Sequence, residues 1–178
     1  MLSSDRILRR RVLGLLAAGP ALVALTGCGY RPLYGTSSKG AAASGELSKV
    51  RVGLIANRAG QRLRNHLLDR MNPRGEPGVP AYSLSVDLAE ARQDLGVRKD
   101  ETRTRANLIL TAAFQLRDLK NSRIIFAGNA QRVSSFNISD AEFSTISAEN
   151  AARRRSVEGL ADEITQRVAV FLNRKPTA

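Results

Sequence analysis

The feature that most constrains the fold is a strict alternation of apolar and polar residues. Apolar side chains occupy every second position over 106–116, and the same period occurs over 82–88 and, more briefly, over 49–55. Successive side chains of a strand point to opposite faces, so this period predicts three half-buried strands. After a polar turn at 118–122, we expect 123–133 to return as the antiparallel partner of 106–116, forming a hairpin.

Two other segments change to a helical period. Beyond Asn57, four apolar residues recur at helical spacing and predict a helix that ends near Asn72 and Pro73. A longer apolar stripe predicts a C-terminal helix that begins between Ser144 and Glu149. The stripe consists of Val157, Leu160, Ala161, Ile164, Val168, Phe171 and Leu172. The order strand, helix, three strands, helix predicts an α+β fold, in which a four-stranded, mostly antiparallel sheet packs against two helices.

Residues 1–27 have the organisation of a lipoprotein signal peptide. Arginines precede an apolar run over 12–25, which is too short to span a bilayer stably. The run ends in a lipobox formed by Leu25, Thr26, Gly27 and Cys28, with small residues beside the expected cleavage site. We expect Cys28 to become the first residue and to carry covalent diacylglycerol and an N-acyl chain. The adjacent arginines at 9–11 leave open whether export is general or twin-arginine.

The rest of the chain divides into an extended tether and one folded domain. The Ser, Gly and Ala-rich stretch within 28–46 has little to bury and predicts a lipidated tether, followed by a single α+β domain over 47–175. Gly29, rather than an aspartate, follows Cys28. We therefore expect delivery to the outer membrane, with the protein lipid-anchored on its periplasmic face.

Charge and composition narrow the possible partners. The net charge is +12, and from Cys28 onward 24 basic residues face 15 acidic ones. Such a basic exported protein can meet anionic lipids, phosphorylated glycolipids, acidic polysaccharides or an acidic protein surface. The compartment disfavours nucleic acid, and with no Trp there is no sign of a stacking platform for single strands.

The residues needed for catalysis or for a metal centre are scarce. His66 is the only histidine and Cys28 the only cysteine, so we expect no enzymatic activity, no metal site and no cofactor beyond the lipid. An anchored cell-wall hydrolase would need a pair of acids. The nearest candidates, Asp87, Glu90 and Asp94, have the pattern of strand and loop surface.

The segment Cys28-Gly29-Tyr30-Arg31-Pro32-Leu33-Tyr34-Gly35 resembles the opening of the LptE family of lipopolysaccharide-assembly lipoproteins, in its alphaproteobacterial form. The likeness continues through 56–65, the strand over 82–88 and the helix around 161–164. It implies a noncatalytic protein that sits as a plug in the LptD β-barrel, helps that barrel assemble, and binds lipopolysaccharide on its way to the outer leaflet. An obligate one-to-one complex is the expected assembly.

Two basic clusters are the candidate lipopolysaccharide-binding residues, because arginine suits bidentate contacts with phosphate. They are Arg98, Lys99, Arg103 and Arg105 before the long strand, and Lys120 and Arg123 around its turn. The two groups should lie at opposite ends of that strand. Nearby acids could neutralise the first cluster, and the run at 153–155 is expected to be a solvated face or a barrel contact. The alternative function is a lipoprotein adaptor of another envelope machine, such as a transport-auxiliary or pilot protein.

Overall fold

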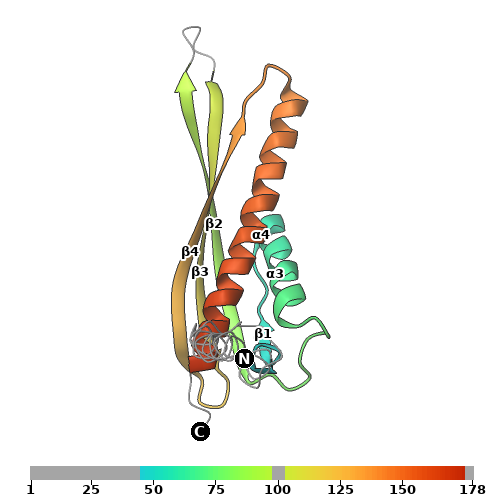
Figure 1. The fold of residues 1–178 in the computed structure, drawn as a ribbon, viewed down its shortest axis with the longest axis vertical. Helices are drawn as coiled ribbons and strands as arrows, with labels where there is room; N and C mark the ends of the chain where they lie inside the picture. The colour runs from blue at the N-terminus through green and yellow to red at the C-terminus, as the bar shows by residue number, and fades with distance from the viewer. Residues whose placement is uncertain (1–44, 98–102, 175–178) are drawn as a thin grey trace, which may run out of the picture. The chain divides into compact units, whose positions relative to one another are not determined.

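The computed structural model describes residues 45–97 and 103–174. Within these residues the sheet and the helices follow in the predicted order (Figure 1). The elements are β1 (Val50–Val52), α3 (Asn57–Met71), β2 (Tyr82–Val97), β3 (Arg103–Asp118), β4 (Arg123–Asn137) and α4 (Glu142–Arg174). The predicted α+β fold, with one four-stranded sheet and two long helices, is confirmed.

The sheet has the order β1-β2-β3-β4, so each strand lies beside its neighbours in the sequence. The short β1 runs parallel to β2, with Val52 opposite Leu84. The other two pairings are antiparallel, and Leu116 of β3 lies between Leu84 and Phe126. The hairpin predicted from the alternation is therefore present, and β2 extends it into a three-stranded meander.

Both helices cover the same face of the sheet, as Figure 1 shows. The alternate residues of β3 from Ala106 to Leu116 are at most 1 % exposed and point into this layer. The stripe predicted on the C-terminal helix faces them, and Leu160 and Ile164 are fully buried. Leu63 and Leu67 of α3 close the core on the side of β1. Burial of these apolar faces is what holds the helices to the sheet.

The opposite face of the sheet is covered by none of the described elements. Its side chains are mostly small and uncharged, and the residues near its centre are exposed. Residues of this face include Ser85, Ala89 and Ala91 of β2, Ala113 and Gln115 of β3, and Ala127, Asn129, Gln131 and Val133 of β4. This broad face carries few charges, since Asp87, Arg105 and Arg117 are the charged residues that the described parts of β2 and β3 place on it.

The main differences from the sequence predictions concern where elements end. β2 was expected to end near residue 88 but continues to Val97, because the charged residues Glu90 and Arg92 on its inner face pair with α4. The helix expected to begin between 144 and 149 begins at Glu142. Thr145 explains this earlier start, since its Oγ1 accepts from Ser139 N–H at 2.9 Å and organises the turn before the helix. The strand predicted over 49–55 is shorter, Val50–Val52.

In the part of the chain that the structure describes, no helix is both long and apolar enough to cross a membrane.

Candidate functional site

The first residues of α3 bring two arginines to one side of the helix. Asn57 begins the helix with a positive φ of 63°, and its Oδ1 accepts a hydrogen bond from Gly60 N–H at 2.9 Å. Gly60 lies directly against Ile55, where a Cβ would meet the Ile55 Cγ2 atom at 2.6 Å. This close approach fixes the start of the helix beside the sheet. Arg58 and Arg62 are four residues apart and therefore share a face.

A network of ion pairs ties the N-terminal half of α4 to the inner face of β2. Arg153 Nη2 lies 2.7 Å from Glu90 Oε1 and 2.7 Å from Glu149 Oε1, and Arg153 Nη1 donates to Asn150 Oδ1 at 2.8 Å. Arg92 extends the network, because its Nη1 lies 3.2 Å from Glu149 Oε2. The Arg92 guanidinium also sits 5.3 Å above the ring centre of Phe136.

These contacts raise the pKa of Arg153 above that of an ordinary arginine. The largest cause is the hydrogen bond to Glu90, burial opposes it, and the hydrogen bond to Glu149 adds to the rise. Arg153 is therefore a permanent cation held in one place, and the Glu90 carboxylate beside it is already engaged by that cation.

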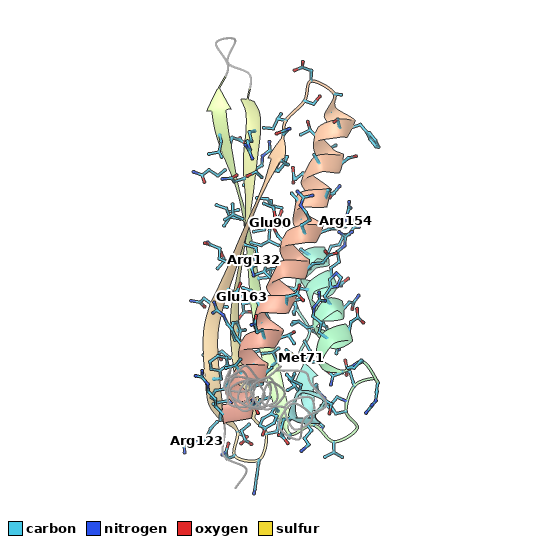
Figure 2. The ribbon with its side chains drawn as sticks, in the orientation of Figure 1. Met71, Glu90, Arg123, Arg132, Arg154 and Glu163 are labelled. Carbon is cyan, nitrogen blue, oxygen red and sulfur yellow. The ribbon has the colours of Figure 1, made fainter. Side chains whose placement is uncertain are left out.

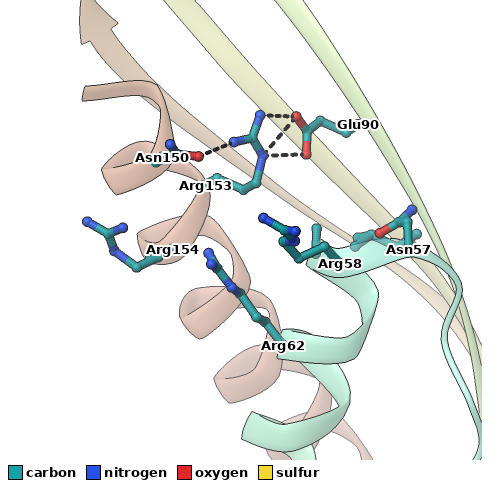
Figure 3. A pocket seen from close by; sticks show the side chains of 9 residues that line it. Asn57, Arg58, Arg62, Glu90, Asn150, Arg153 and Arg154 are labelled. Atoms are coloured by element: carbon teal, nitrogen blue, oxygen red, sulfur yellow. Dashed lines mark hydrogen bonds and ion pairs between the residues drawn. The ribbon is translucent and has the colours of Figure 1, made fainter. Parts of the chain in front are cut away.

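Between α3, α4 and β2 lies a pocket of about 510 Å³ (Figure 3). Figure 3 shows Arg58 and Arg62 reaching from α3 towards α4, below the pair formed by Arg153 and Glu90. Four arginines and one carboxylate line the pocket, so its wall carries an excess of positive charge. The lining residues are Asn57, Arg58, Ala59, Arg62, Leu88, Glu90, Asn150, Arg153 and Arg154.

Three of the four arginines have no acidic partner within the described residues. Arg58, Arg62 and Arg154 form none of the ion pairs found there, whereas Arg153 takes up Glu90. Arg58 and Arg154 are exposed and Arg62 is half-buried. Guanidinium groups in a concave site can donate to several oxygens of one anion, so the arrangement is suited to binding an anionic group.

The predicted lipidation site lies outside the described residues. Leu25, Thr26, Gly27 and Cys28 are not among residues 45–97 and 103–174, and the same holds for Arg98 and Lys99. Arg103 begins β3 opposite Val97, and its side chain is also outside the described part.

The remaining predicted binding residues lie along the β3–β4 hairpin and not in the pocket. Arg105 is exposed on β3 opposite Leu95 and Asn137, while Lys120 and Arg123 are exposed at the β3–β4 turn. At the rise of an antiparallel strand, Arg105 and Arg123 are roughly 40 Å apart. Figure 2 shows Arg123 at one end of the sheet, well away from Glu90 and Arg154. The described members of the two groups, Arg105 on one side and Lys120 and Arg123 on the other, therefore lie at opposite ends of the hairpin, whereas Arg98 and Lys99 lie outside the described residues.

The acids considered for a hydrolase do not form a pair. Glu90 and Asp94 are exposed residues of strand β2, as expected, and the structure adds that they lie on its inner face, where Arg153 and Arg92 engage them. Asp87 points to the opposite face of the sheet. Among the described residues there is no group of histidine, cysteine and acidic side chains that could hold a metal ion.

The sequence prediction missed the pocket. Arg153 belongs to a run expected to be a solvated face or a barrel contact, but its side chain is only 21 % exposed and it pairs with Glu90. Arg58 and Arg62 were not singled out, although their spacing already places them on one face of a helix. What the sequence could not provide was the packing of α3 against α4, which brings Arg58 near Arg154.

The fold is similar to that of solved bacterial lipoproteins. A lipoprotein of Caulobacter crescentus CB15 matches 76 % of this chain and 98 % of its own, with 24 % identity and a TM-score of 0.64. A minor lipoprotein of Acinetobacter baumannii matches 69 % of this chain and 92 % of its own, with 20 % identity and a TM-score of 0.56. The rare lipoprotein B of Shewanella oneidensis matches 68 % of this chain and 93 % of its own, with 12 % identity and a TM-score of 0.54.

No curated protein gives a significant match to the chain. The family model described as "LptE: Lipopolysaccharide-assembly" matches residues 47–168, which is well over half of the sequence and includes the sheet, α3 and most of α4. This family assignment was expected from the motif that begins at Cys28 and from the later segments. The chain therefore belongs to the LptE family of lipopolysaccharide-assembly proteins.

Proposed function

We propose that this protein is a lipid-anchored, noncatalytic partner of an LptD-like outer-membrane β-barrel and that it binds lipopolysaccharide during delivery to the outer leaflet. The observation that carries the proposal is the match of the lipopolysaccharide-assembly family over residues 47–168. The lipobox at 25–28 supports an anchor at Cys28, and Gly29 supports delivery to the periplasmic face of the outer membrane. Residues 1–27 are the signal peptide, 28–46 the tether and 47–175 the folded domain in this proposal.

The distribution of charge on the folded part supports two kinds of contact. The uncovered face of the sheet is broad, carries few charges and has mostly small side chains near its centre, so another protein surface can approach it closely. Charged residues of β2 and both helices are concentrated on the other side of the molecule. We assign the uncovered sheet face to contact with the barrel and the basic regions to anionic parts of lipopolysaccharide.

The hairpin cations remain candidate lipopolysaccharide contacts. The proposal predicts that replacing Arg98, Lys99, Arg103 and Arg105 together with glutamine weakens lipopolysaccharide binding at low salt, where exposed charges are least screened. The second group, Lys120 and Arg123, is tested in a separate variant because it lies at the far end of the hairpin. Unchanged affinity of both variants would remove the hairpin from the binding surface.

The first test is purification of the tagged, lipidated protein from its native envelope in mild detergent, followed by identification of stoichiometric partners. A large β-barrel together with lipopolysaccharide is the expected result. Recovery of an inner-membrane transporter or a secretin instead would replace the proposal with the adaptor function. The Cys28→Ser variant should lose the acyl chains in mass spectrometry and leave the outer-membrane fraction.

A second test addresses the uncovered sheet face. The double variant Gln115→Glu with Gln131→Glu adds two negative charges to the centre of this face without changing side-chain size. It should reduce recovery of the barrel, because unpaired charges would be buried in the contact. The matched control, Gln61→Glu with Gln166→Glu, adds the same charge to exposed positions on the helices and should leave recovery unchanged.

A further inference from the structure

Three of the four arginines that line the pocket between α3 and α4, namely Arg58, Arg62 and Arg154, differ from most arginines on the helix side of the protein. There, Arg70 pairs with Asp162, Arg132 and Arg167 pair with Glu163, and Arg153 pairs with Glu90 and Glu149. Arg58 and Arg62 have no such partner within the described residues, although both line a concave site. The one carboxylate of that site, Glu90, is held by Arg153 through both of its oxygens. Within the described residues, the pocket therefore contains more positive charge than its single carboxylate neutralises.

The surroundings of the pocket add to its preference for an anion. The first turn of α3 contains no acidic residue, so the positive end of the helix dipole is not compensated there. Asn57 and Asn150 add amide groups to the wall. Arg153 is immobilised by Glu149 and Asn150, so the α4 side of the pocket is preorganised.

The number and type of cations favour phosphate over a carboxylate. One arginine is enough for a bidentate contact with a carboxylate, whereas a phosphate group presents three oxygens and up to two negative charges. Arg58, Arg62 and Arg154 supply three guanidinium groups that pair with no acid in the described part of the chain. The pocket volume of about 510 Å³ exceeds what a phosphate alone requires and lies in the range of small-molecule sites, about 300–1,000 Å³. Leu88 and Ala59 give the remaining wall an apolar part on which a sugar ring can lie.

We propose that the pocket between α3, α4 and β2 binds a phosphorylated sugar, with Arg58, Arg62 and Arg154 contacting the phosphate and the pair of Arg153 and Glu90 forming the fixed wall. This inference rests on the proposed function, since it assigns a phosphate-bearing part of lipopolysaccharide to this pocket, in addition to the anionic groups that the hairpin cations contact.

The experiment measures binding to the full-length lipidated protein in neutral detergent at constant ionic strength. The probes are inorganic phosphate, glucosamine 6-phosphate, lipopolysaccharide and the same lipopolysaccharide after enzymatic removal of its phosphates. The pocket variant is Arg58→Gln, Arg62→Gln and Arg154→Gln. The control variant is Arg51→Gln, Arg74→Gln and Arg155→Gln, which removes the same charge from exposed positions outside the pocket.

The expected result is that the pocket variant binds glucosamine 6-phosphate and lipopolysaccharide about tenfold more weakly or worse, because charge-assisted hydrogen bonds are lost. The control variant should keep its affinity for both probes. Equal weakening in the two variants would show a general effect of charge and would overturn the proposal, as would unchanged binding in the pocket variant. Equal affinity for intact and dephosphorylated lipopolysaccharide would overturn the identification of phosphate.

Comparison of the probes separates the source of the phosphate. Binding of glucosamine 6-phosphate without lipopolysaccharide binding would keep the sugar phosphate site and contradict the proposed function. Recovery of the barrel and lipopolysaccharide by a pocket variant that no longer binds glucosamine 6-phosphate would leave the proposed function standing and overturn the assignment of lipopolysaccharide phosphate to the pocket. Should the triple variant fail to fold, the single variant Arg58→Gln changes one exposed side chain and decides the same question.

Discussion

Arg153 of α4 holds the carboxylate of Glu90 on β2 in a forked contact. Its Nη2 lies 2.7 Å from Oε1 and its Nε lies 3.0 Å from Oε2. The two side chains are 21 % and 31 % exposed, so they are sheltered from water more than an ordinary surface pair. This contact joins two elements that are far apart in the sequence and lets a strand with charged inward-facing residues continue beyond its apolar part.

A double-mutant cycle on this contact should give a favourable coupling energy. We expect Glu90→Gln and Arg153→Gln to be coupled by about 1 kcal/mol in the free energy of unfolding, above the median of exposed pairs because both groups are partly buried. Urea denaturation of the two single variants and the double variant measures the coupling. Arg155→Gln, an exposed neighbour of the same helix, should show no coupling to Glu90→Gln. If the losses of unfolding free energy in the two single variants simply add in the double variant, the coupling energy is zero and the contact between Arg153 and Glu90 does not itself stabilise the fold.

Gly60→Ala should destabilise the fold, although alanine favours helices. The added Cβ would meet Ile55 Cγ2 at 2.6 Å and the Ile55 carbonyl carbon at 3.1 Å. We expect a loss of about 2 kcal/mol, because neighbours in a packed core must shift to accept the methyl group. Gly45→Ala is the control, since nothing lies within 4 Å of its new Cβ, and it should change the melting temperature little. A melting temperature of Gly60→Ala at or above that of the parent would contradict this packing.

Tyr82 should make the fold sensitive to alkaline pH. Burial raises the pKa of Tyr82 above the ordinary value of 10.0, and the Glu46 carboxylate, which accepts from its hydroxyl at 3.1 Å, raises it further. A raised pKa in the folded state means that the neutral form is favoured there. The stabilisation that the Tyr82 hydroxyl provides is complete at pH values below its pKa in the unfolded state, about 10. It is lost as pH rises through the pKa of the folded state.

Tyr82→Phe should therefore flatten the alkaline part of the curve of unfolding free energy against pH. Near neutral pH it should cost about 1 kcal/mol for the lost hydrogen bond. Comparison of the variant with the parent cancels the titration of other groups, since only the difference between the two curves reports Tyr82. A constant difference across the alkaline range would show that the Tyr82 pKa is the same in the folded and unfolded states.

The Leu160→Ala variant tests how much stability the protein gains from burial of the apolar stripe on α4. Leu160 is fully buried between the helix and the sheet, so truncation should cost about 3 kcal/mol through lost burial and the cavity left behind. Ile146→Ala on the same helix is the control, because Ile146 is 50 % exposed and its truncation should change stability by less than about 0.5 kcal/mol. Similar losses for both variants would contradict a special contribution from burial of Leu160, because alanine favours helices and propensity alone would not lower stability at either position.

The alternation of apolar and polar residues predicted the strands correctly wherever one face of the sheet is apolar. Leu84 and Leu116 alternate with polar neighbours, and both point into the core as expected. The alternation did not predict that β2 continues beyond Leu88, because Glu90 and Arg92 occupy inward positions that the pattern assigns to apolar residues. Charged side chains can occupy such positions only when partners neutralise them, and those partners come from α4.

The local chemistry of the sequence was sufficient to predict the order of strands and helices and the apolar face that each one buries. The tertiary structure decided which charges remain unpaired. Arg58 and Arg153 look alike in the sequence, yet among residues 45–97 and 103–174 Arg58 lines the pocket without an acidic partner and Arg153 is bound to Glu90. The physical reason is that hydrophobic periodicity is a property of neighbouring residues, whereas an ion pair depends on distances across the fold. Only the packing of α3 and α4 against the sheet sets those distances.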